Sequence, residues 1–420
     1  MIKDKKINIV GIIAEYNPFH NGHAYHIQKA KELANADYCV IVMSGDFVQR
    51  GAPAIYDKYT RAEMALASGA DLVLEIPSIF ATCSAEDFAA CSVSLLTRLG
   101  VVDSLCFGSE CGDVEKLSSI ASILATEPSV YSENLKQELR KGLTFPEARI
   151  QALISSGAIT KEEAFILSSP NNILGIEYIK ALIRQNSMIK PVTLNRKGSD
   201  YHETNLTIDR YSSATGIREF LKESAQNLND NSSILAHVPD IVKPIMEKSM
   251  PLFTDDFGVL LNTALLRLCH EEVPYIKYAD VSEELSRRMM KQLPDYVPMD
   301  DKINQLKTRQ YTYTRISRAL IHILLGITKI QIEEGRKAGY APYGRILGFR
   351  KNSVPLLNAI KKRGSIPLIA KTAGAEKNIS NVAASMLRQD FYSSHIYQTV
   401  YQDKYKLKTK NEFTRSVVIL

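Results

Sequence analysis

The chain has 420 residues, of which 45% are hydrophobic and 23% are charged, as in an ordinary globular protein with two or three domains. No apolar run is long enough to span a membrane, which excludes an integral membrane protein of the helical class. The six cysteines form no CxxC pair and show no zinc spacing, so a reducing, cytoplasmic location is expected.

Charge is distributed unevenly along the chain. The net charge is +6, yet residues 301–420 contain 22 Lys and Arg against seven Asp and Glu, whereas residues 1–300 contain 30 against 39. A basic C-terminal part behind an acidic part favours a polyanionic partner such as RNA. A merely solvated basic surface is the alternative interpretation.

The first 110 residues alternate between apolar, β-branched runs and segments of helical composition. Strands are expected at 7–14, 38–43, 71–76 and 104–108, and helices at 24–36, 57–68 and 85–99. This alternation is typical of parallel βαβ units, and ligands bind beyond the carboxyl ends of such strands. His20, the segment 44–46, Glu75 and the segment 108–110 follow strands and are therefore expected to converge on one cleft.

The remaining sequence predicts a helical insertion and then a second domain. Residues 113–168 look helical and polar; a helix at 172–184, a strand at 190–195 and a helix at 217–225 follow. From about 235 the pattern is mostly helical. We therefore expect an α/β fold: a Rossmann-like parallel-sheet nucleotidyltransferase domain (1–235), followed by a mainly α-helical, basic, RNA-binding domain (236–420).

The segment His20-Asn-Gly-His23 carries most of the functional information. It lies where the first strand gives way to the first helix, and main-chain amides at a helix start favour an anion. His20 and His23 add side-chain donors at that point, and Gly22 allows close approach of the backbone. The pattern predicts a nucleoside triphosphate site in which the α-phosphate is attacked; two surface histidines beside a turn are the alternative.

This segment resembles the HxGH signature of the nucleotidyltransferase superfamily, which class I aminoacyl-tRNA synthetases share. The longer string Ala14-Glu-Tyr-Asn-Pro-Phe-His-Asn-Gly-His23, with Ser44-Gly-Asp-Phe-Val-Gln-Arg-Gly51, resembles a narrower family, the tRNA(Met) cytidine acetate ligases. The similarity extends through Asn171-Asn-Ile-Leu-Gly-Ile-Glu-Tyr178 and Tyr343-Gly-Arg-Ile-Leu-Gly-Phe349.

The resemblance implies catalytic roles for His20 and His23 and a set of ATP contacts. These contacts comprise the segment Ile13, Ala14, Glu15, Tyr16, Asn17, Pro18, Phe19, His20, Asn21, Gly22 and His23, together with Gly108, Asn172, Arg196, Lys197, Ser213 and Thr215. Residues 212–218 resemble the superfamily's second signature, a Ser/Thr-rich helix start for the β- and γ-phosphates. Whether Asn171 or Asn172 contacts ATP stays open, and so does the role of the polar loop 46–61.

The basic part supplies candidate RNA contacts. Arginines and tyrosines alternate near residue 315, which suits phosphate binding and base stacking. The candidates are Arg315, Arg318, Arg345, Arg350, Lys361, Lys362 and Arg363. No cluster of side chains has metal-ligand spacing, so any Mg²⁺ is expected to arrive with ATP.

The resulting hypothesis is an ATP-dependent ligase. Acetate and ATP would give acetyl-adenylate and pyrophosphate, and the acetyl group would pass to the wobble cytidine of elongator tRNA(Met) as N4-acetylcytidine. Acetate, cytidine and this tRNA follow from the resemblance alone. The alternatives are a small-molecule adenylyltransferase, a class I synthetase, which the missing Lys-Met-Ser-Lys-Ser pattern disfavours, and an RNA-binding module with a relict nucleotide site.

Overall fold

The computed structural model describes residues 7–195, 214–227, 232–291 and 296–420. An eight-stranded sheet forms the centre of this part of the chain, in the order β10-β8-β5-β2-β1-β6-β7, with β9 paired to β8. The strands are β1 (Ile9–Ala14), β2 (Tyr38–Ser44), β5 (Leu72–Ile76), β6 (Ser104–Ser109), β7 (Lys190–Asn195), β8 (Gly344–Phe349), β9 (Leu368–Ile369) and β10 (Val418–Ile419).

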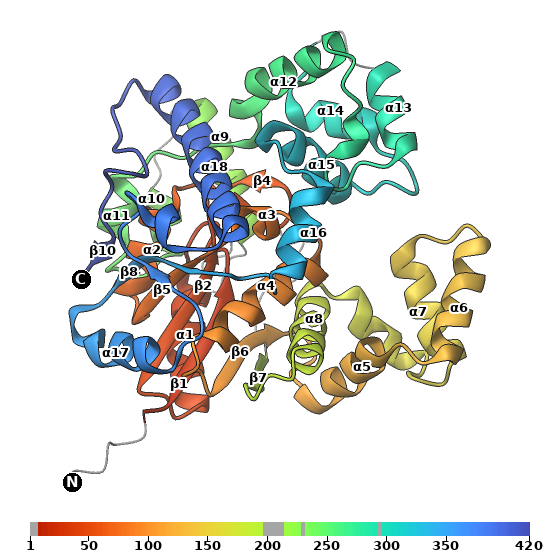
Figure 1. The fold of residues 1–420 in the computed structure, drawn as a ribbon, viewed down its shortest axis with the longest axis horizontal. Coiled ribbons are helices and arrows are strands. Elements are labelled where there is room, and N and C mark those ends of the chain that lie inside the picture. Colours follow the sequence, from red (N-terminus) through yellow and green to blue (C-terminus); the bar gives the residue numbers. More distant parts are fainter. Residues whose placement is uncertain (1–6, 196–213, 228–231, 292–295) are drawn as a thin grey trace.

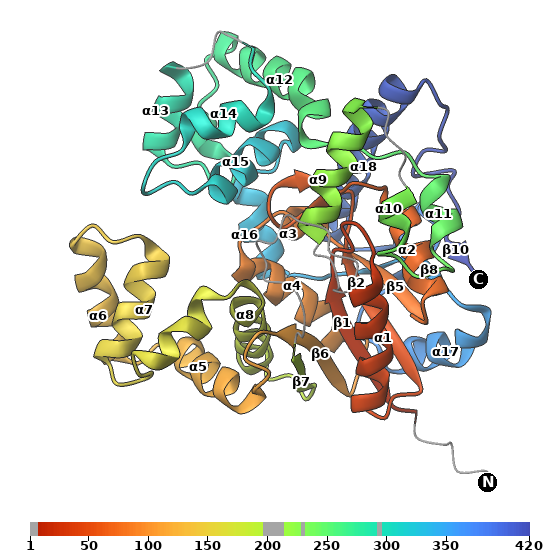
Figure 2. The ribbon, with the colours of Figure 1, turned by 180° about the vertical axis from the view of Figure 1, so that it is seen from behind.

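The five strands from β5 to β7 in this order pair in parallel, as the alternating sequence pattern predicts. Helices cover both faces of the sheet (Figures 1 and 2). The helices between the strands are α1 (Asn21–Leu33), α2 (Lys58–Ala67), α3 (Ser78–Ala81), α4 (Ala85–Arg98) and α8 (Pro170–Arg184). The expected α/β class is therefore confirmed.

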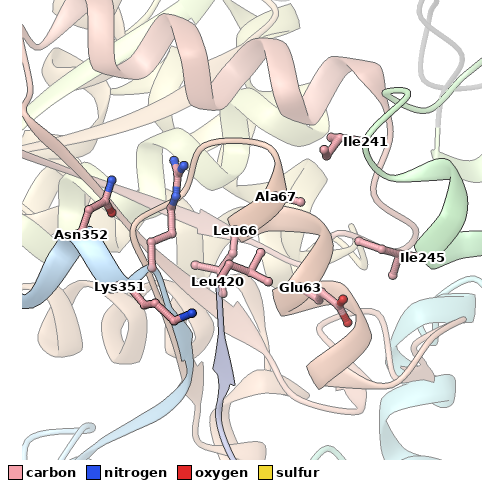
Figure 3. A pocket seen from close by; sticks show the side chains of 9 residues that line it. Glu63, Leu66, Ala67, Ile241, Ile245, Lys351, Asn352 and Leu420 are labelled. Atoms are coloured by element: carbon pink, nitrogen blue, oxygen red, sulfur yellow. The ribbon is translucent and has the colours of Figure 1, made fainter.

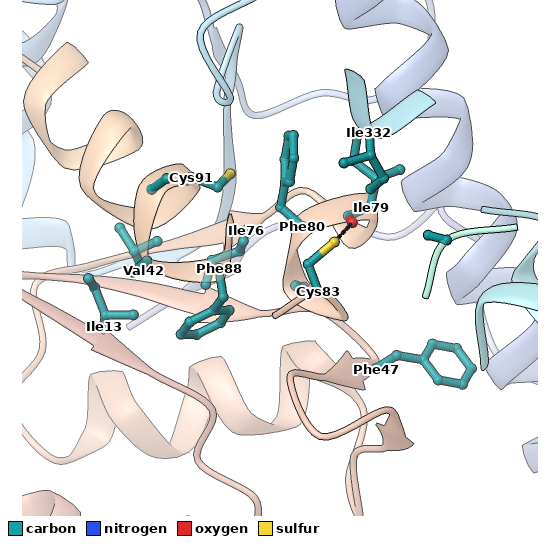
Figure 4. Packing of buried hydrophobic residues seen from close by; sticks show 14 of the residues in the cluster. Ile13, Val42, Phe47, Ile76, Ile79, Phe80, Cys83, Phe88, Cys91 and Ile332 are labelled. Carbon is teal, nitrogen blue, oxygen red and sulfur yellow. Dashed lines mark hydrogen bonds between the residues drawn. The ribbon is translucent and has the colours of Figure 1, made fainter. Parts of the chain in front are cut away.

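Alternate residues of each central strand enter two separate cores. In β2, Val40 and Val42 pack with α3, α4 and α8, whereas Ile41 and Met43 pack with α1 and α2 on the other face. Both faces are buried, which explains why these strands are continuously apolar rather than alternating. Figure 4 shows the first core, where the buried Cys83 thiol donates to the Ile79 carbonyl at 2.9 Å.

A helical insertion projects from the sheet between β6 and β7. It contains α5 (Val114–Thr126), α6 (Ser129–Arg140), α7 (Phe145–Ser155) and the 3-10 helix η1 (Glu162–Ser168). α6 and α7 pack on each other and extend away from the sheet, while α5 packs on α8 (Figure 1). Residues 113–168 are thus helical, as the sequence predicts.

Beyond residue 213 the chain first packs helices on the α1–α2 side of the sheet, then forms a helical lobe, and then returns to the sheet (Figures 1 and 2). The elements before the return are α9 (Ala214–Asn227), α10 (Ser232–Leu235), α11 (Lys243–Glu247), η2 (Thr254–Phe257), α12 (Gly258–His270), η3 (Tyr275–Lys277), α13 (Glu283–Lys291), α14 (Met299–Leu306), α15 (Tyr313–Leu325) and α16 (Lys329–Lys337). None of the described helices is long and apolar enough to cross a membrane.

The return to the sheet is a feature that the sequence did not predict. β8 lies antiparallel to β5, with Leu72 opposite Phe349, and β10 extends the sheet beyond it. The rest of this segment comprises η4 (Lys351–Ser353), α17 (Val354–Arg363), η5 (Ala375–Asn378) and the long helix α18 (Asn381–Tyr405). Residues 344–420 therefore belong to the core of the sheet domain as well as to the C-terminal half.

Candidate active site

The two histidines of the HxGH segment lie at the start of α1, directly beyond the carboxyl end of β1. His20 caps the helix, and its Nδ1 accepts the Gly22 N–H at 3.0 Å, while His23 Nδ1 accepts the His20 N–H at 3.3 Å. The two rings stack with their centroids 3.8 Å apart. Because Nδ1 accepts in both rings, the proton of each neutral imidazole resides on Nε2, which is then a donor.

Gly22 is required by contact rather than by backbone conformation. A Cβ at this position would lie 2.8 Å from His20 Cε1, closer than real Cβ contacts allow. Any side chain here would displace the His20 ring. The stacked pair therefore depends on the glycine between its members.

Two aromatic residues that precede His20 pack against the His23 ring. Tyr16 and Phe19 are buried, and each packs against the His23 ring, with centroids 4.9 and 5.6 Å away. Ile13, Asn17 and Pro18 are also buried, whereas Ala14, Glu15, Asn21, Gly22 and His23 are half-buried. Asn17 Oδ1 accepts the Ile55 N–H at 2.7 Å, which fixes the turn to the loop after β2.

The helix α9 is fastened to the same turn. Arg218 donates from Nη1 to the Asn17 carbonyl at 2.7 Å and from Nη2 to Thr215 Oγ1 at 2.9 Å. Burial lowers the pKa of Arg218, and the nearby Glu15 carboxylate opposes that effect. The predicted phosphate-binding Thr215 thus lies beside the HxGH turn; Ser213 lies outside the described residues.

The end of β6 contributes a further part of the site, in which Glu110 is hydrogen-bonded to Asn171 and Asn172. The Glu110 carboxylate accepts the Asn171 and Asn172 main-chain N–H groups and Asn171 Nδ2, while Asn172 Oδ1 accepts the N–H groups of Glu110 and Cys111. Asn172 is fully buried, and its Nδ2 has no hydrogen-bond partner among the described residues. Gly108 is half-buried at the same strand end.

This geometry separates the two asparagines that the sequence left undistinguished. The side-chain Nδ2 of Asn171 donates to the Glu110 carboxylate, whereas the buried Nδ2 of Asn172 has no hydrogen-bond partner among the described residues. A buried donor without a partner is costly unless a ligand completes it. The neighbouring prediction, Arg196 and Lys197, lies outside the described residues, directly after the end of β7.

The polar loop after β2 is mostly structural. It contains the short hairpin of β3 (Phe47–Val48) and β4 (Ala52–Pro53). Arg61 is fully buried and donates to four main-chain carbonyls, those of Glu15, Ser44, Gly45 and Tyr56. It therefore ties together the ends of β1 and β2 with four of its five N–H donors, which indicates a structural role, although its position in the sequence allowed a binding role.

One predicted RNA contact is wrong. Arg345 is 1% exposed and pairs through its guanidinium with Glu75 at 2.9 Å and with Glu412. Lys58, which is also fully buried, joins the same two carboxylates at 2.8 and 3.3 Å. These four residues form a buried charge cluster that holds β8 and the C-terminal segment against the loop after β2.

The cluster was missed because its members are far apart in the sequence. Glu412 lies in a basic stretch, residues 403–415, in which the other acidic residue is Asp403. This position was the one available signal in the sequence. Burial alone would raise the pKa of the Glu412 carboxyl, but Lys58 and Arg345 lower it to about 2. Such a carboxylate is an internal partner for cations, not a site for solvent-borne ligands.

The other predicted RNA contacts fall into two separate places. Arg315 and Arg318 lie on α15 beside the loop after β2: Ser317 Oγ donates to the Gly51 carbonyl at 2.6 Å. Arg318 pairs with Asp280 at 2.8 Å, and the Arg315 guanidinium lies 4.9 Å above the Tyr311 ring. The second group lies at the opposite, amino-terminal edge of the sheet, remote from His20 and His23: Arg350, Lys361, Lys362 and Arg363.

Comparison with known proteins agrees with this geometry. Residues 7–412 match a family model described as HIGH Nucleotidyl Transferase. A tRNA(Met) cytidine acetate ligase of Acetivibrio thermocellus is 38% identical over 99% of this chain and all of that protein. Another, from Clostridium tetani, is 41% identical over 87% of this chain and 90% of that protein.

The chain belongs to the tRNA(Met) cytidine acetate ligase family. A crystal structure of Thermotoga maritima TmcAL bound with alpha-thio ATP superposes with a TM-score of 0.88 at 32% identity, covering 99% of this chain and all of that one. The apo form of the same protein gives a TM-score of 0.90. The resemblance inferred from the HxGH segment is therefore confirmed over nearly the whole length of this family member.

Proposed function

We propose that the protein is an ATP-dependent tRNA(Met) cytidine acetate ligase. The observation that carries the proposal is the stacked His20–His23 pair at the start of α1, beyond the carboxyl end of β1, in which the hydrogen bonds accepted by Nδ1 make Nε2 the donor atom of each neutral ring. The family relationship supplies the substrates, and the superposed ATP-analogue complex of the Thermotoga protein supports ATP as the nucleotide.

In the first step an acetate oxygen forms a bond to the α-phosphorus of ATP, and the bond to the bridging oxygen of pyrophosphate breaks. Negative charge accumulates on the non-bridging α-phosphate oxygens. The Nε2 donors of His20 and His23 and the positive end of the α1 dipole stabilise that charge. The products are acetyl-adenylate and pyrophosphate.

In the second step the exocyclic amine of the cytidine attacks the acetyl carbonyl carbon. AMP leaves with the electrons of the carbon–oxygen bond, and the amine loses one proton to give N4-acetylcytidine. The buried Asn172 Nδ2 is placed to donate to the adenine or ribose, which would hold the adenylate during both steps.

Mg²⁺ would accompany ATP. No group of three or more His, Cys, Asp and Glu side chains among the described residues is arranged to hold a metal ion. The phosphates of the nucleotide would therefore supply most of its ligands. The six unpaired cysteines are compatible with the cytoplasm, where tRNA is available.

The direct test is mass spectrometry of N4-acetylcytidine in tRNA(Met) incubated with the protein, ATP and acetate. Modification should require all three components, and His23→Ala should lower the rate by about 10²–10³-fold, as for the loss of one transition-state donor. His270→Ala removes an exposed histidine on α12 and serves as the matched control. Acetate-dependent adenylation without any tRNA product would instead favour a small-molecule adenylyltransferase.

A further inference from the structure

A strongly basic segment faces solvent on the side of the sheet away from the histidines. Between Glu334 and Glu376 the sequence has no acidic residue but nine Lys and Arg. Five of these cations are exposed or half-exposed and lie at the start or the end of the η4–α17 segment; we term them the amino-edge patch (Arg350, Lys351, Lys361, Lys362 and Arg363).

Main-chain contacts fix the position of the patch. The Arg350 N–H donates to the carbonyl of Asp71, the residue before β5, and Ser365 N–H donates to the carbonyl of Arg98, shortly before β6. Both contacts lie at the amino ends of parallel strands, whereas His20 follows the carboxyl end of β1. A strand of six residues separates the two edges by about 20 Å at ~3.3 Å per residue.

The five cations have no internal role that would explain them. None of them forms an ion pair with another residue in the part of the chain that the structure describes, unlike Arg318 with Asp280 or Lys404 with Asp256. An uncompensated cluster of this kind raises the local concentration of a polyanion. The histidines are too distant for the patch to serve the nucleotide that reacts there.

A hollow of about 620 Å³ adjoins the patch and includes two of its members (Figure 3). Five of its lining residues are apolar: Leu66 and Ala67 of α2, Ile241, Ile245 and Leu420. Arg350 also lines the hollow. In Figure 3, Lys351 and Asn352 lie on one side of it and Glu63 lies on the other. The volume is in the range of small-ligand sites.

We propose that the amino-edge patch and its hollow bind a second, unpaired nucleotide of the substrate tRNA, remote from the acetylated cytidine. The apolar lining suits an unstacked base, Asn352 and Glu63 offer groups for its polar edge, and the cations suit the flanking phosphates. This inference rests on the proposed function. It implies that the enzyme holds the tRNA at both edges of one sheet, so that a stem–loop carrying only the target cytidine lacks the second contact.

The test compares full-length tRNA(Met) with its isolated anticodon stem–loop. The triple variant Lys361→Ala, Lys362→Ala, Arg363→Ala should weaken binding of the full-length tRNA and raise its KM at least tenfold. It should also flatten the dependence of log affinity on log salt, by about 0.7–0.9 for each lost phosphate contact. Stem–loop affinity, kcat and acetate-dependent ATP–pyrophosphate exchange should not change.

Ala67→Trp fills the hollow without altering charge and should raise the full-length KM several-fold. The matched control is Lys136→Ala with Arg140→Ala, which removes exposed cations from α6. Full-length affinity within twofold of wild type in the triple variant would overturn the inference, as would equal losses for the stem–loop or in the control. The affinity measurement does not need turnover, so absence of N4-acetylcytidine from the wild-type protein would refute the proposed function separately.

Discussion

Arg218 on α9 donates to the Asn17 carbonyl at 2.7 Å and so joins the two sequence signatures that the chain separates by about 200 residues. Asn17 begins the turn that ends in His20, and Thr215 accepts from the same guanidinium. The starts of α1 and α9 are therefore held as one unit, and a phosphate chain bound at α1 would meet the start of α9 next.

Arg218→Gln should lower the catalytic efficiency with ATP. Gln cannot span both acceptors, so the turn and α9 would lose their connection while the helices themselves keep their caps and cores. We expect a rise in the KM for ATP and a fall in kcat of about tenfold each, measured by acetate-dependent ATP–pyrophosphate exchange. Lys222→Gln, one turn further along α9, alters a half-exposed pair with Asp255 and Asp300 and should have little effect.

Gly22→Ala should impair the chemistry with little loss of stability. The new methyl would lie within 2.8 Å of His20 Cε1, so the ring must move and the stacked pair is broken. Alanine is otherwise favourable in a helix, which limits the cost in folding free energy. We expect kcat to fall by about 10²-fold while the midpoint of thermal unfolding changes by a few degrees at most. Unchanged kcat would show that the position of His20 does not limit the rate.

Much of this site could be predicted from the sequence because its main elements are close together along the chain. A β-branched run followed by a turn and HxGH fixes a strand, a helix start and two donors within 15 residues, and the alternating pattern places the other strand ends beside them. The return of β8 was not accessible. The segment that forms β8 is a short run with two glycines that follows several helices. Nothing in it indicates that it pairs with β5, which lies about 270 residues earlier.

The same limit explains the error at Arg345. Its type and its basic surroundings are those of a phosphate-binding residue, and only the fold brings Glu75 and Glu412 to its guanidinium. Conversely, the roles of Asn171 and Asn172 could not be distinguished by composition. They differ because the Glu110 carboxylate accepts the side-chain Nδ2 of Asn171 but only the main-chain N–H of Asn172. This arrangement is a property of the turn after β6.

The two asparagines should therefore respond differently to alanine. Asn172→Ala removes the acceptor of two main-chain N–H groups and the unused Nδ2 donor, so it should cost about 1–3 kcal/mol of stability and raise the KM for ATP at least tenfold. Asn171→Ala removes one part-buried side-chain hydrogen bond to Glu110 and should change the KM for ATP less than threefold. Chemical denaturation and initial rates at varied ATP separate the two effects, and equal KM changes would contradict the assignment.

The buried charge cluster predicts a pH-dependent contribution to stability. Lys58 and Arg345 lower the pKa of Glu412 to about 2 despite its burial, whereas in the unfolded chain this carboxyl titrates near its ordinary pKa of 4.5. The contribution is therefore complete at neutral pH, declines as the pH falls below about 4.5, and is lost as the pH passes through 2.

Glu412→Gln should lower the free energy of unfolding by about 3–5 kcal/mol at pH 7, because two buried cations lose one of their carboxylates. The difference from wild type should shrink as the pH is lowered from 5 toward 2, since the wild-type carboxylate is then progressively protonated. Glu376→Gln, which breaks an exposed pair with Arg388, should cost less than about 1 kcal/mol. A loss in Glu412→Gln that does not vary with pH would refute the ionic origin of this stabilisation.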